Sequence, residues 1–117
     1  MNRHITILED DIDIREICTY ILSEEGYCVE SFGDIASFNA RIKSADLFLL
    51  DIRLPDGNGM DVCDQLKKDP RFSATPIILM SAHQQRSSAM LRSCADDFIE
   101  KPFDIQAIIQ RVARLIA

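Results

Sequence analysis

A short, uninterrupted apolar run near the middle of the chain constrains the fold most. Residues 47–50 are all apolar, Asp51 follows them directly, and turn residues follow at 55–57. A continuous apolar run bounded by turn residues is typical of a strand buried on both faces, and such strands occur almost exclusively in parallel sheets covered by helices. The sequence therefore predicts a core strand with one carboxylate, Asp51, at its carboxyl end.

Similar apolar runs alternate with segments whose apolar residues recur every three or four positions, the period of an amphipathic helix. The expected strands cover residues 4–8, 27–32, 47–51, 77–81 and 97–100. The expected helices carry apolar stripes within residues 14–22, 35–42, 60–66, 82–94 and 105–116, the fourth of them the weakest. The stripes expected to be buried include Ile17 in the first helix and Ile105 in the last.

Residues at the expected helix ends agree with these assignments. Asp13 and Glu16 have the spacing of a capping box, and Gly26 is placed to end the first helix. Asp34 and Asp104 stand where N-caps of the second and last helices are expected.

Strands that alternate with helices imply parallel pairing through right-handed crossovers, with helices on both faces of the sheet. For five strands and five helices the common solution is a doubly wound, flavodoxin-like α/β fold with strand order 2-1-3-4-5. We expect a single domain over residues 1–117, since a chain of this length with 47% apolar residues builds one core.

Composition excludes several classes of function. The formal net charge of −6 argues against direct nucleic-acid binding, which needs a basic face. No apolar run approaches membrane-spanning length and no leader-like start is present, so we expect no membrane association and a cytoplasmic location. The four cysteines lack Cys-x-x-Cys spacing and are expected to be core residues.

Polar residues that follow the strands converge in this topology, because the carboxyl ends of strands one, three, four and five lie side by side. Those ends carry Glu9, Asp10, Asp51, Ser81 and Lys101. Each residue alone has an ordinary explanation as a loop acid, a strand-end hydroxyl or a surface charge. Their joint placement at successive strand ends indicates a functional site.

Three neighbouring carboxylates repel one another unless a cation neutralises them, and an oxygen-only ligand set favours Mg²⁺ over Zn²⁺. We expect Asp10 and Asp51 to be direct ligands, Glu9 to act mainly through water, and the backbone carbonyl of Arg53 to add another oxygen. An aspartate beside such a metal can attack an activated phosphoryl group.

Phosphoryl transfer depends mainly on positioning and charge neutralisation. Asp51 is the candidate nucleophile, and its product is an aspartyl phosphate. The ammonium of Lys101 and the hydroxyl of Ser81 are expected to bind oxygens of the phosphoryl group.

The acidic pair at 9–10, the motif LLDIRLPDG at 49–57, Ser-Ala at 81–82 and Lys-Pro-Phe at 101–103 together resemble the bacterial response-regulator receiver domain over essentially the whole chain. The resemblance implies that Asp51 is the phosphoacceptor and that Glu9 and Asp10 are the magnesium acids. It also implies that Ser81 is the switch hydroxyl and that Lys101 contacts the phosphate.

The same resemblance assigns roles to further residues. Phe98 is implied as the switch aromatic, Ala82 as a small residue that leaves the phosphoryl group accessible, and Arg53 and His83 as residues that tune hydrolysis of the acyl phosphate. The peptide bond between residues 101 and 102 is implied to be cis. Cys94 stands where the family commonly has a glycine, so we expect a short or irregular fourth helix.

The expected function is therefore phosphorelay signal transduction. A histidine kinase or a phosphotransfer protein donates a phosphoryl group to Asp51 with Mg²⁺ present, and the output face of the fourth helix, fifth strand and fifth helix then changes its partners. This is a signalling switch, not a turnover enzyme. Its downstream partner is an effector protein or an effector domain, and homodimerisation through the output face is left open.

Three alternatives belong to other classes. An adaptor that binds partners without phosphorylation is compatible with the fold. A small aspartate-nucleophile phosphatase is suggested by the Asp-Ile-Asp sequence at 11–13, but the chain offers no substrate cap domain. A flavodoxin-type cofactor binder shares the architecture, but the acidic loop at 9–11 would repel the cofactor's phosphate.

Overall fold

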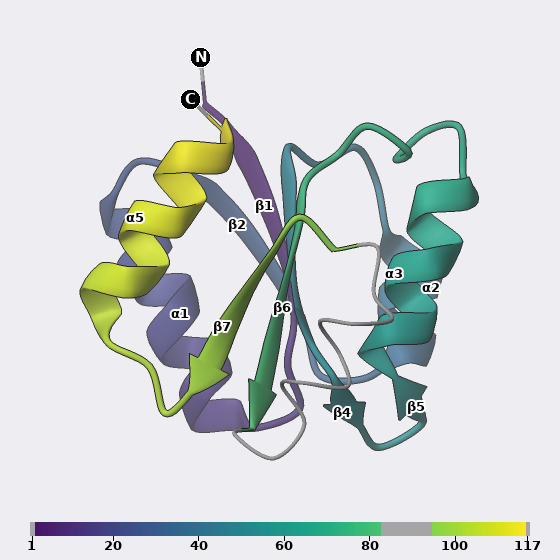
Figure 1. Cartoon of the computed structure of the whole chain (residues 1–117), viewed down its shortest axis with the longest axis horizontal. Coiled ribbons are helices and arrows are strands. Elements are labelled where there is room, and N and C mark those ends of the chain that lie inside the picture. The colour runs from purple at the N-terminus through teal and green to yellow at the C-terminus, as the bar shows by residue number, and fades with distance from the viewer. Residues whose placement is uncertain (1, 83–94, 117) are drawn as a thin grey trace.

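The computed structural model of the chain describes residues 2–82 and 95–116. Five parallel strands form one sheet in the order β2-β1-β3-β6-β7 (Figure 1). These strands are β1 (His4–Leu8), β2 (Cys28–Phe32), β3 (Leu47–Asp51), β6 (Ile77–Ala82) and β7 (Asp97–Lys101). Numbered among themselves, they have the predicted order 2-1-3-4-5, which confirms the doubly wound parallel fold.

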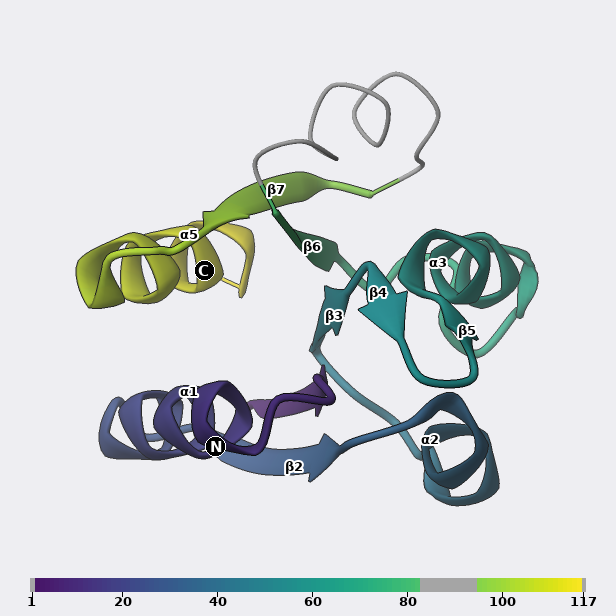
Figure 2. The same cartoon turned by 90° about the horizontal axis from the view of Figure 1, so that it is seen from below.

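Helices cover both faces of the sheet, as Figure 2 shows. Helices α1 (Ile12–Glu24) and α5 (Ile105–Ile116) lie on one face, and α2 (Ile35–Arg41) and α3 (Gly59–Lys68) lie on the other. The described residues thus contain four of the five expected helices. The fourth was expected within 82–94; residues 83–94 lie outside the described part of the chain, and Ala82 is the last residue of β6 instead of the start of a helix. Within the described ranges, no helix has the length and hydropathy needed to cross a bilayer.

The central strand β3 is buried along its whole length, as its apolar run predicts. Leu47 and Leu49 pack with α1 and α5, whereas Phe48 and Leu50 pack with α2 and α3. Successive side chains of a strand point to opposite faces, so both helical layers rest on the same five-residue strand. Asp51 is the last residue of this strand and lies at the rim of the core.

The structure corrects the predicted start of α1. The N-cap is Asp11, whose Oδ1 accepts from the backbone N–H groups of Asp13 at 2.9 Å and Ile14 at 3.1 Å. The predicted cap, Asp13, lies instead in the first turn of the helix, where its negative charge interacts favourably with the positive end of the helix dipole. The predicted end is confirmed, because Gly26 follows the helix with a φ of 96°.

The turn after β3 contains a short antiparallel hairpin that the sequence did not predict. Strands β4 (Arg53–Leu54) and β5 (Gly57–Asn58) pair across the turn formed by residues 55 and 56. The hairpin leads directly into α3, whose N-cap is Asn58.

Two residues expected in buried stripes are exposed. Ile17 in α1 is 50% exposed and Ile105 in α5 is 48% exposed. The side of α1 that meets the sheet is narrow and holds Cys18, Ile21 and Leu22, so Ile17 lies on the flank of the helix. Ile17 and Ile105 line the same surface hollow, together with Tyr20.

Candidate functional site

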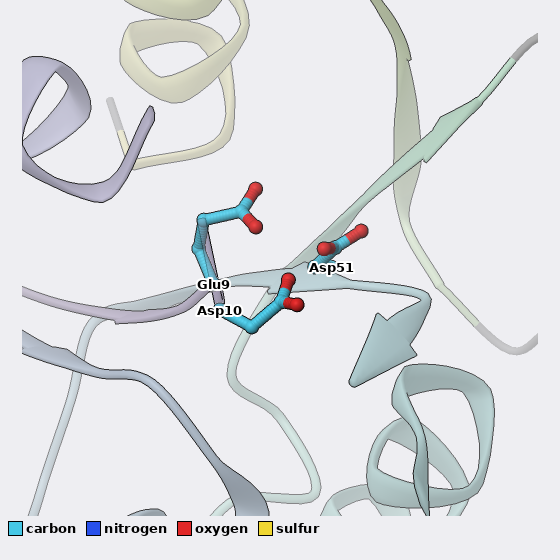
Figure 3. Close-up of side chains that lie close together, drawn as sticks. All are labelled: Glu9, Asp10 and Asp51. Carbon is cyan, nitrogen blue, oxygen red and sulfur yellow. The ribbon is translucent and has the colours of Figure 1, made fainter. Parts of the chain in front are cut away.

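The acidic residues predicted to converge do meet at one edge of the sheet. Glu9 and Asp10 directly follow β1, and Asp51 ends β3, the neighbouring strand. Carboxylate oxygens of these three side chains lie within 4.8 Å of one another, and Figure 3 shows the three groups turned towards a common point. The strand order brings them together, because the carboxyl ends of adjacent parallel strands share an edge.

The three acids differ in their contact with solvent. Glu9 is completely buried, Asp51 is 5% exposed, and Asp10 is exposed. The backbone N–H of Glu9 donates to the carbonyl oxygen of Phe32 at 3.0 Å, which continues the pairing of β1 with β2 by one residue. One carboxylate of the group is therefore held inside the protein, and another remains reachable from outside.

Lys101, the last residue of β7, places its ammonium between two of the acids. Its Nζ lies 2.6 Å from Oε1 of Glu9 and 3.2 Å from Oδ2 of Asp51. Burial by itself would lower the pKa of Lys101, but its hydrogen bond to Glu9 and the negative charges of Asp51 and Glu9 outweigh this effect and raise the pKa. Lys101 is therefore a cation at neutral pH.

Glu9 is destabilised as an anion in spite of this lysine. Burial and the closeness of the Asp51 carboxyl raise the pKa of Glu9 from 4.5 to about 7. Lys101 offsets one negative charge among three carboxylates, so the cluster still favours a further cation.

A hard divalent cation fits this arrangement. The ligands on offer are carboxylate oxygens, which Mg²⁺ prefers, and the pocket beside them has a volume of about 280 Å³. Arg53 and Ala82 also line the pocket. The pocket leaves room for water and for a phosphoryl group beside the acids.

Ser81 lies near the end of β6, beside β7. Its side chain is completely buried, and its Oγ has no hydrogen-bond partner among the described residues. An unpaired buried hydroxyl is costly unless a partner arrives during function. The next residue, Ala82, pairs in register with Lys101, so the hydroxyl and the ammonium lie on adjacent strand ends.

The backbone of Asp51 is held by the start of α3. A Cβ at Gly59 would overlap the carbonyl oxygen of Asp51 and lie 2.8 Å from its carbonyl carbon. The N–H of Gly59 also donates to the carbonyl oxygen of Ile52 at 2.7 Å. The close approach that glycine permits thus fixes the peptide that follows the buried aspartate.

The structure places the remaining predicted residues as follows. Arg53 is exposed in β4, with its backbone paired to Asn58. Phe98 is half-buried in β7 and packs on the core cluster of the α2 and α3 side. The peptide bond between Lys101 and Pro102 is cis, as expected. His83 lies outside the described residues.

Two supporting residues were missed in the sequence. Arg15 donates from Nη1 to the carbonyl oxygen of Glu9 at 2.9 Å, beside Gly33. Asp56, in the hairpin turn, accepts from the N–H groups of Ile35 at 2.9 Å and Ala36 at 3.0 Å, so it caps α2 from a distance. Neither periodicity nor local spacing predicts such contacts, because each joins residues that only the fold brings together.

Comparison with known proteins identifies relatives along almost the whole chain. The family model described as "Response regulator receiver domain" matches residues 5–113. The DNA-binding response regulator MtrA of Mycobacterium tuberculosis is 36% identical over 98% of this chain and 51% of its own length. The transcriptional regulatory protein GltR of Pseudomonas aeruginosa is 31% identical over 97% and 49%. The chain thus spans about half the length of the curated relatives it matches.

Solved structures agree with the fold. The receiver domain of a signal transduction histidine kinase from Syntrophus aciditrophicus is 30% identical, with a TM-score of 0.87 over 97% of this chain and 89% of its own. The BeF3-activated DrrB receiver domain is 25% identical, with a TM-score of 0.90 over 99% of this chain and 98% of its own.

Proposed function

The chain belongs to the response regulator receiver domain family of phosphorelay signalling proteins, and on this premise we propose that Asp51 is its phosphoacceptor. One observation carries the proposal. The Asp51 carboxylate lies at the edge of the core beside two further acids, with the Lys101 ammonium 3.2 Å away. A nucleophile, a metal-binding acid pair and a cation for phosphoryl oxygens are thus gathered in one pocket.

We assign the metal ligands as Asp10, Asp51 and the backbone carbonyl of Arg53, with Glu9 acting mainly through water. The bound Mg²⁺ supplies neutralisation of the negative charge on the acids and on the phosphoryl oxygens. Because Glu9 is completely buried and already bonded to Lys101, it contributes charge more than direct coordination. Exposed Asp10 is the acid best placed to take up a cation from solvent.

In the transfer step, an oxygen of the ionised Asp51 carboxylate attacks the phosphorus of a phosphohistidine. The new oxygen–phosphorus bond forms as the phosphorus–nitrogen bond breaks, and the electron pair of the broken bond returns to the imidazole nitrogen, which takes up a proton. Lys101 binds one phosphoryl oxygen from its position between Glu9 and Asp51. The chain itself ends the step as an aspartyl phosphate, so it acts as a switch and not as a turnover enzyme.

Ser81 supplies the link from phosphate to output face. Its buried, unpaired hydroxyl gains a hydrogen-bond acceptor when a phosphoryl group is attached to Asp51. Movement of Ser81 opens space for half-buried Phe98 on the adjacent strand to turn inward. This differential contact with the phosphate biases the β7 and α5 surface between two states. Ala82 keeps the phosphoryl group accessible, and Arg53 and His83 tune its hydrolysis.

We propose that the protein that donates the phosphoryl group docks on the α1/α5 patch, defined as Ile12, Ile17, Tyr20 and Ile105. Ile12 directly follows Asp11, which lines the pocket, and Ile105 begins the helix that follows Lys101. A hollow of about 530 Å³ lies within the patch, and Asp13 and Glu16 add negative charge to its lining. The matching partner is a histidine kinase or phosphotransfer protein with an apolar helix face flanked by basic residues.

The remaining assignments follow from the same function. We place the protein in the cytoplasm, where a kinase can reach it, and expect a downstream effector protein or effector domain to recognise the switched face. MtrA is described as a DNA-binding response regulator, so a DNA-binding effector is one candidate. This domain's net charge of −6 makes nucleic-acid binding by the domain itself unfavourable.

The test is intact-mass measurement after incubation with Mg²⁺ and a small-molecule phosphodonor. We expect one phosphoryl adduct on the wild type and none on Asp51→Asn, with the adduct retained by the matched control Asp61→Asn on the exposed side of α3. Lys101→Ala is expected to lose most of the adduct, whereas Lys68→Ala is expected to keep it. If the wild type binds Mg²⁺ and gains no adduct, the proposal is wrong, and a phosphorylation-independent interaction module replaces it.

A further inference from the structure

Arg15 of α1 holds the backbone of the acidic loop. Its Nη1 donates to the carbonyl oxygen of Glu9 at 2.9 Å. That carbonyl belongs to the peptide that joins Glu9 to Asp10, the two acids assigned to the metal. The N–H of Glu9 donates on its other side to Phe32, at 3.0 Å. The backbone of Glu9 is thus fixed at both of its polar groups, once by β2 and once by α1.

The orientation of this one peptide affects both acids. A peptide unit is planar, so its rotation changes ψ of Glu9 and φ of Asp10 together. Those two angles set where the Glu9 and Asp10 side chains leave the backbone. A hydrogen bond that fixes the carbonyl therefore also fixes the directions in which both carboxylates approach Asp51.

Gly33, in the loop after β2, provides the space that Arg15 occupies. A Cβ at position 33 would overlap Nη1 of Arg15 and lie 3.4 Å from its Cζ. Gly33 is not among the glycines with positive φ, which are Gly26 and Gly57 in the described residues, so its backbone conformation is open to other residues. The missing side chain at position 33 serves the placement of the Arg15 guanidinium.

We propose that Arg15 and Gly33 form a positioning pair for the metal site. Arg15 holds the peptide between Glu9 and Asp10, and Gly33 leaves the guanidinium room to do so. The inference rests on the proposed metal-assisted phosphorylation and extends it to two residues that touch neither the metal nor the phosphoryl group. Partners behind the ligands of a metal site commonly change metal affinity tenfold or more.

The pair makes an unusual prediction for Gly33→Ala. The group that the new Cβ meets is the far end of a flexible side chain, which moves aside at little cost to stability. The displaced guanidinium then loses its bond to Glu9. We expect Gly33→Ala and Arg15→Ala each to weaken Mg²⁺ binding about tenfold. The double variant is expected to be no weaker than either single variant, because both act through one hydrogen bond.

The experiment titrates Mg²⁺ calorimetrically into metal-free wild type, the two single variants and the double variant. Arg41→Ala is the matched control, since it removes one positive charge from an exposed position on α2. Thermal unfolding in EDTA checks that the variants remain folded. Arg15→Lys, which keeps the charge but not the planar fork of donors, is expected to recover part of the affinity.

A second measurement needs no metal. The amide of Asp10 lies in the same peptide as the Glu9 carbonyl, so its nitrogen chemical shift in the metal-free protein should change in Arg15→Ala and Gly33→Ala alike, and not in Arg41→Ala. Unchanged Mg²⁺ affinity in Gly33→Ala beside a loss in Arg15→Ala would overturn the pair, because Arg15 would then act through its charge. If the wild type does not bind Mg²⁺ but the amide shifts change as expected, the proposed metal site is wrong. Arg15 and Gly33 would then position the loop at Glu9 and Asp10 without serving a metal.

Discussion

On the α2 and α3 side of the sheet a connected row of aromatic rings is buried, whereas α1 and α5 leave large apolar side chains in solvent. The row contains four rings, each packed edge to face on the next with centroids 5.4 to 6.0 Å apart: Phe32, Phe38, Phe48 and Phe72. All four are buried. On the other side, the four residues of the α1/α5 patch are between 48% and 67% exposed.

The difference separates two tasks. Edge-to-face aromatic pairs add stability beyond the area they bury, so the α2 and α3 layer is suited to hold the sheet and the Asp51 loop in place. An exposed cluster of large apolar residues does not stabilise the monomer and commonly marks an interaction surface. The molecule is therefore expected to tolerate changes on one side that it does not tolerate on the other.

The largest effect is expected from Phe72→Ala. Phe72 is 2% exposed and ends the aromatic row, and removing its ring should lower the free energy of unfolding by about 3–5 kcal/mol. Tyr20→Ala on the α1/α5 patch should change it by less than about 0.5 kcal/mol. Urea unfolding measures both. Equal losses would break the contrast between the layers, and Phe72→Leu supplies a milder variant if Phe72→Ala does not fold.

Gly59→Ala tests how closely the α2 and α3 layer holds the acceptor. At an ordinary helix position this change is stabilising by about 1 kcal/mol, because alanine favours helices. Here the new Cβ overlaps the Asp51 carbonyl, which is backbone and cannot move aside easily. We expect a loss of about 1–3 kcal/mol in urea unfolding and slower phosphorylation by a small donor. A gain in stability would show that α3 does not constrain Asp51.

The pH dependence of stability tests the α1 and α5 side of the sheet, because buried Glu9 lies next to α1. Burial and the negative charge of Glu9 together raise the pKa of Cys18 in α1 to about 12. Glu9 itself has a pKa raised from 4.5 to about 7, so the folded protein holds its proton more tightly than the unfolded chain does. The resulting stabilisation is complete below about pH 4.5 and is lost as the pH rises through about 7.

In EDTA, the unfolding free energy of the wild type should therefore fall between pH 5 and pH 8 relative to that of Glu9→Gln, by on the order of 2–3 kcal/mol. Adding Mg²⁺ should offset the loss at pH 8, because the cation stabilises the ionised carboxylate. Parallel pH profiles for the wild type and Glu9→Gln would refute the assignment of this titration to Glu9.

The smallest effect on stability, with the clearest effect on partner choice, is expected on the α1/α5 patch. Ile17→Lys should leave urea unfolding within about 0.5 kcal/mol of the wild type, since Ile17 is half exposed. Its positive charge should repel the basic rim of a phosphohistidine-bearing donor and slow transfer at least tenfold. Phosphorylation by a small donor, which needs no docking, should be unchanged. Slowing of both reactions would mean that the variant damages the site and not the docking surface.

Much of the fold could be predicted because its signals are local. The apolar run ending at Asp51 indicated a doubly buried strand, and the alternation with helical stripes indicated a parallel sheet. The convergence of Glu9, Asp51 and Lys101 followed from topology, and the structure confirms that they meet. Their roles in phosphorylation remain predictions that the adduct experiment tests.

The errors have a common physical origin. Its spacing to Glu16 predicted Asp13 as the cap of α1, but the path of the loop after β1 makes Asp11 the cap. Ile17 and Ile105 fit a helical stripe, but how much of that stripe is covered depends on how α1 and α5 sit against the sheet.

The sequence by itself determined where the buried strands lie along the chain and which residue types stand at their carboxyl ends, because both depend on neighbours along the chain. What only the tertiary structure decided was how those ends are held. Asp56 caps a helix 20 residues away, Arg15 reaches back to the Glu9 carbonyl, and Gly33 and Gly59 are small because other groups lie against them. Such contacts depend on distances across the fold, and no local pattern encodes them.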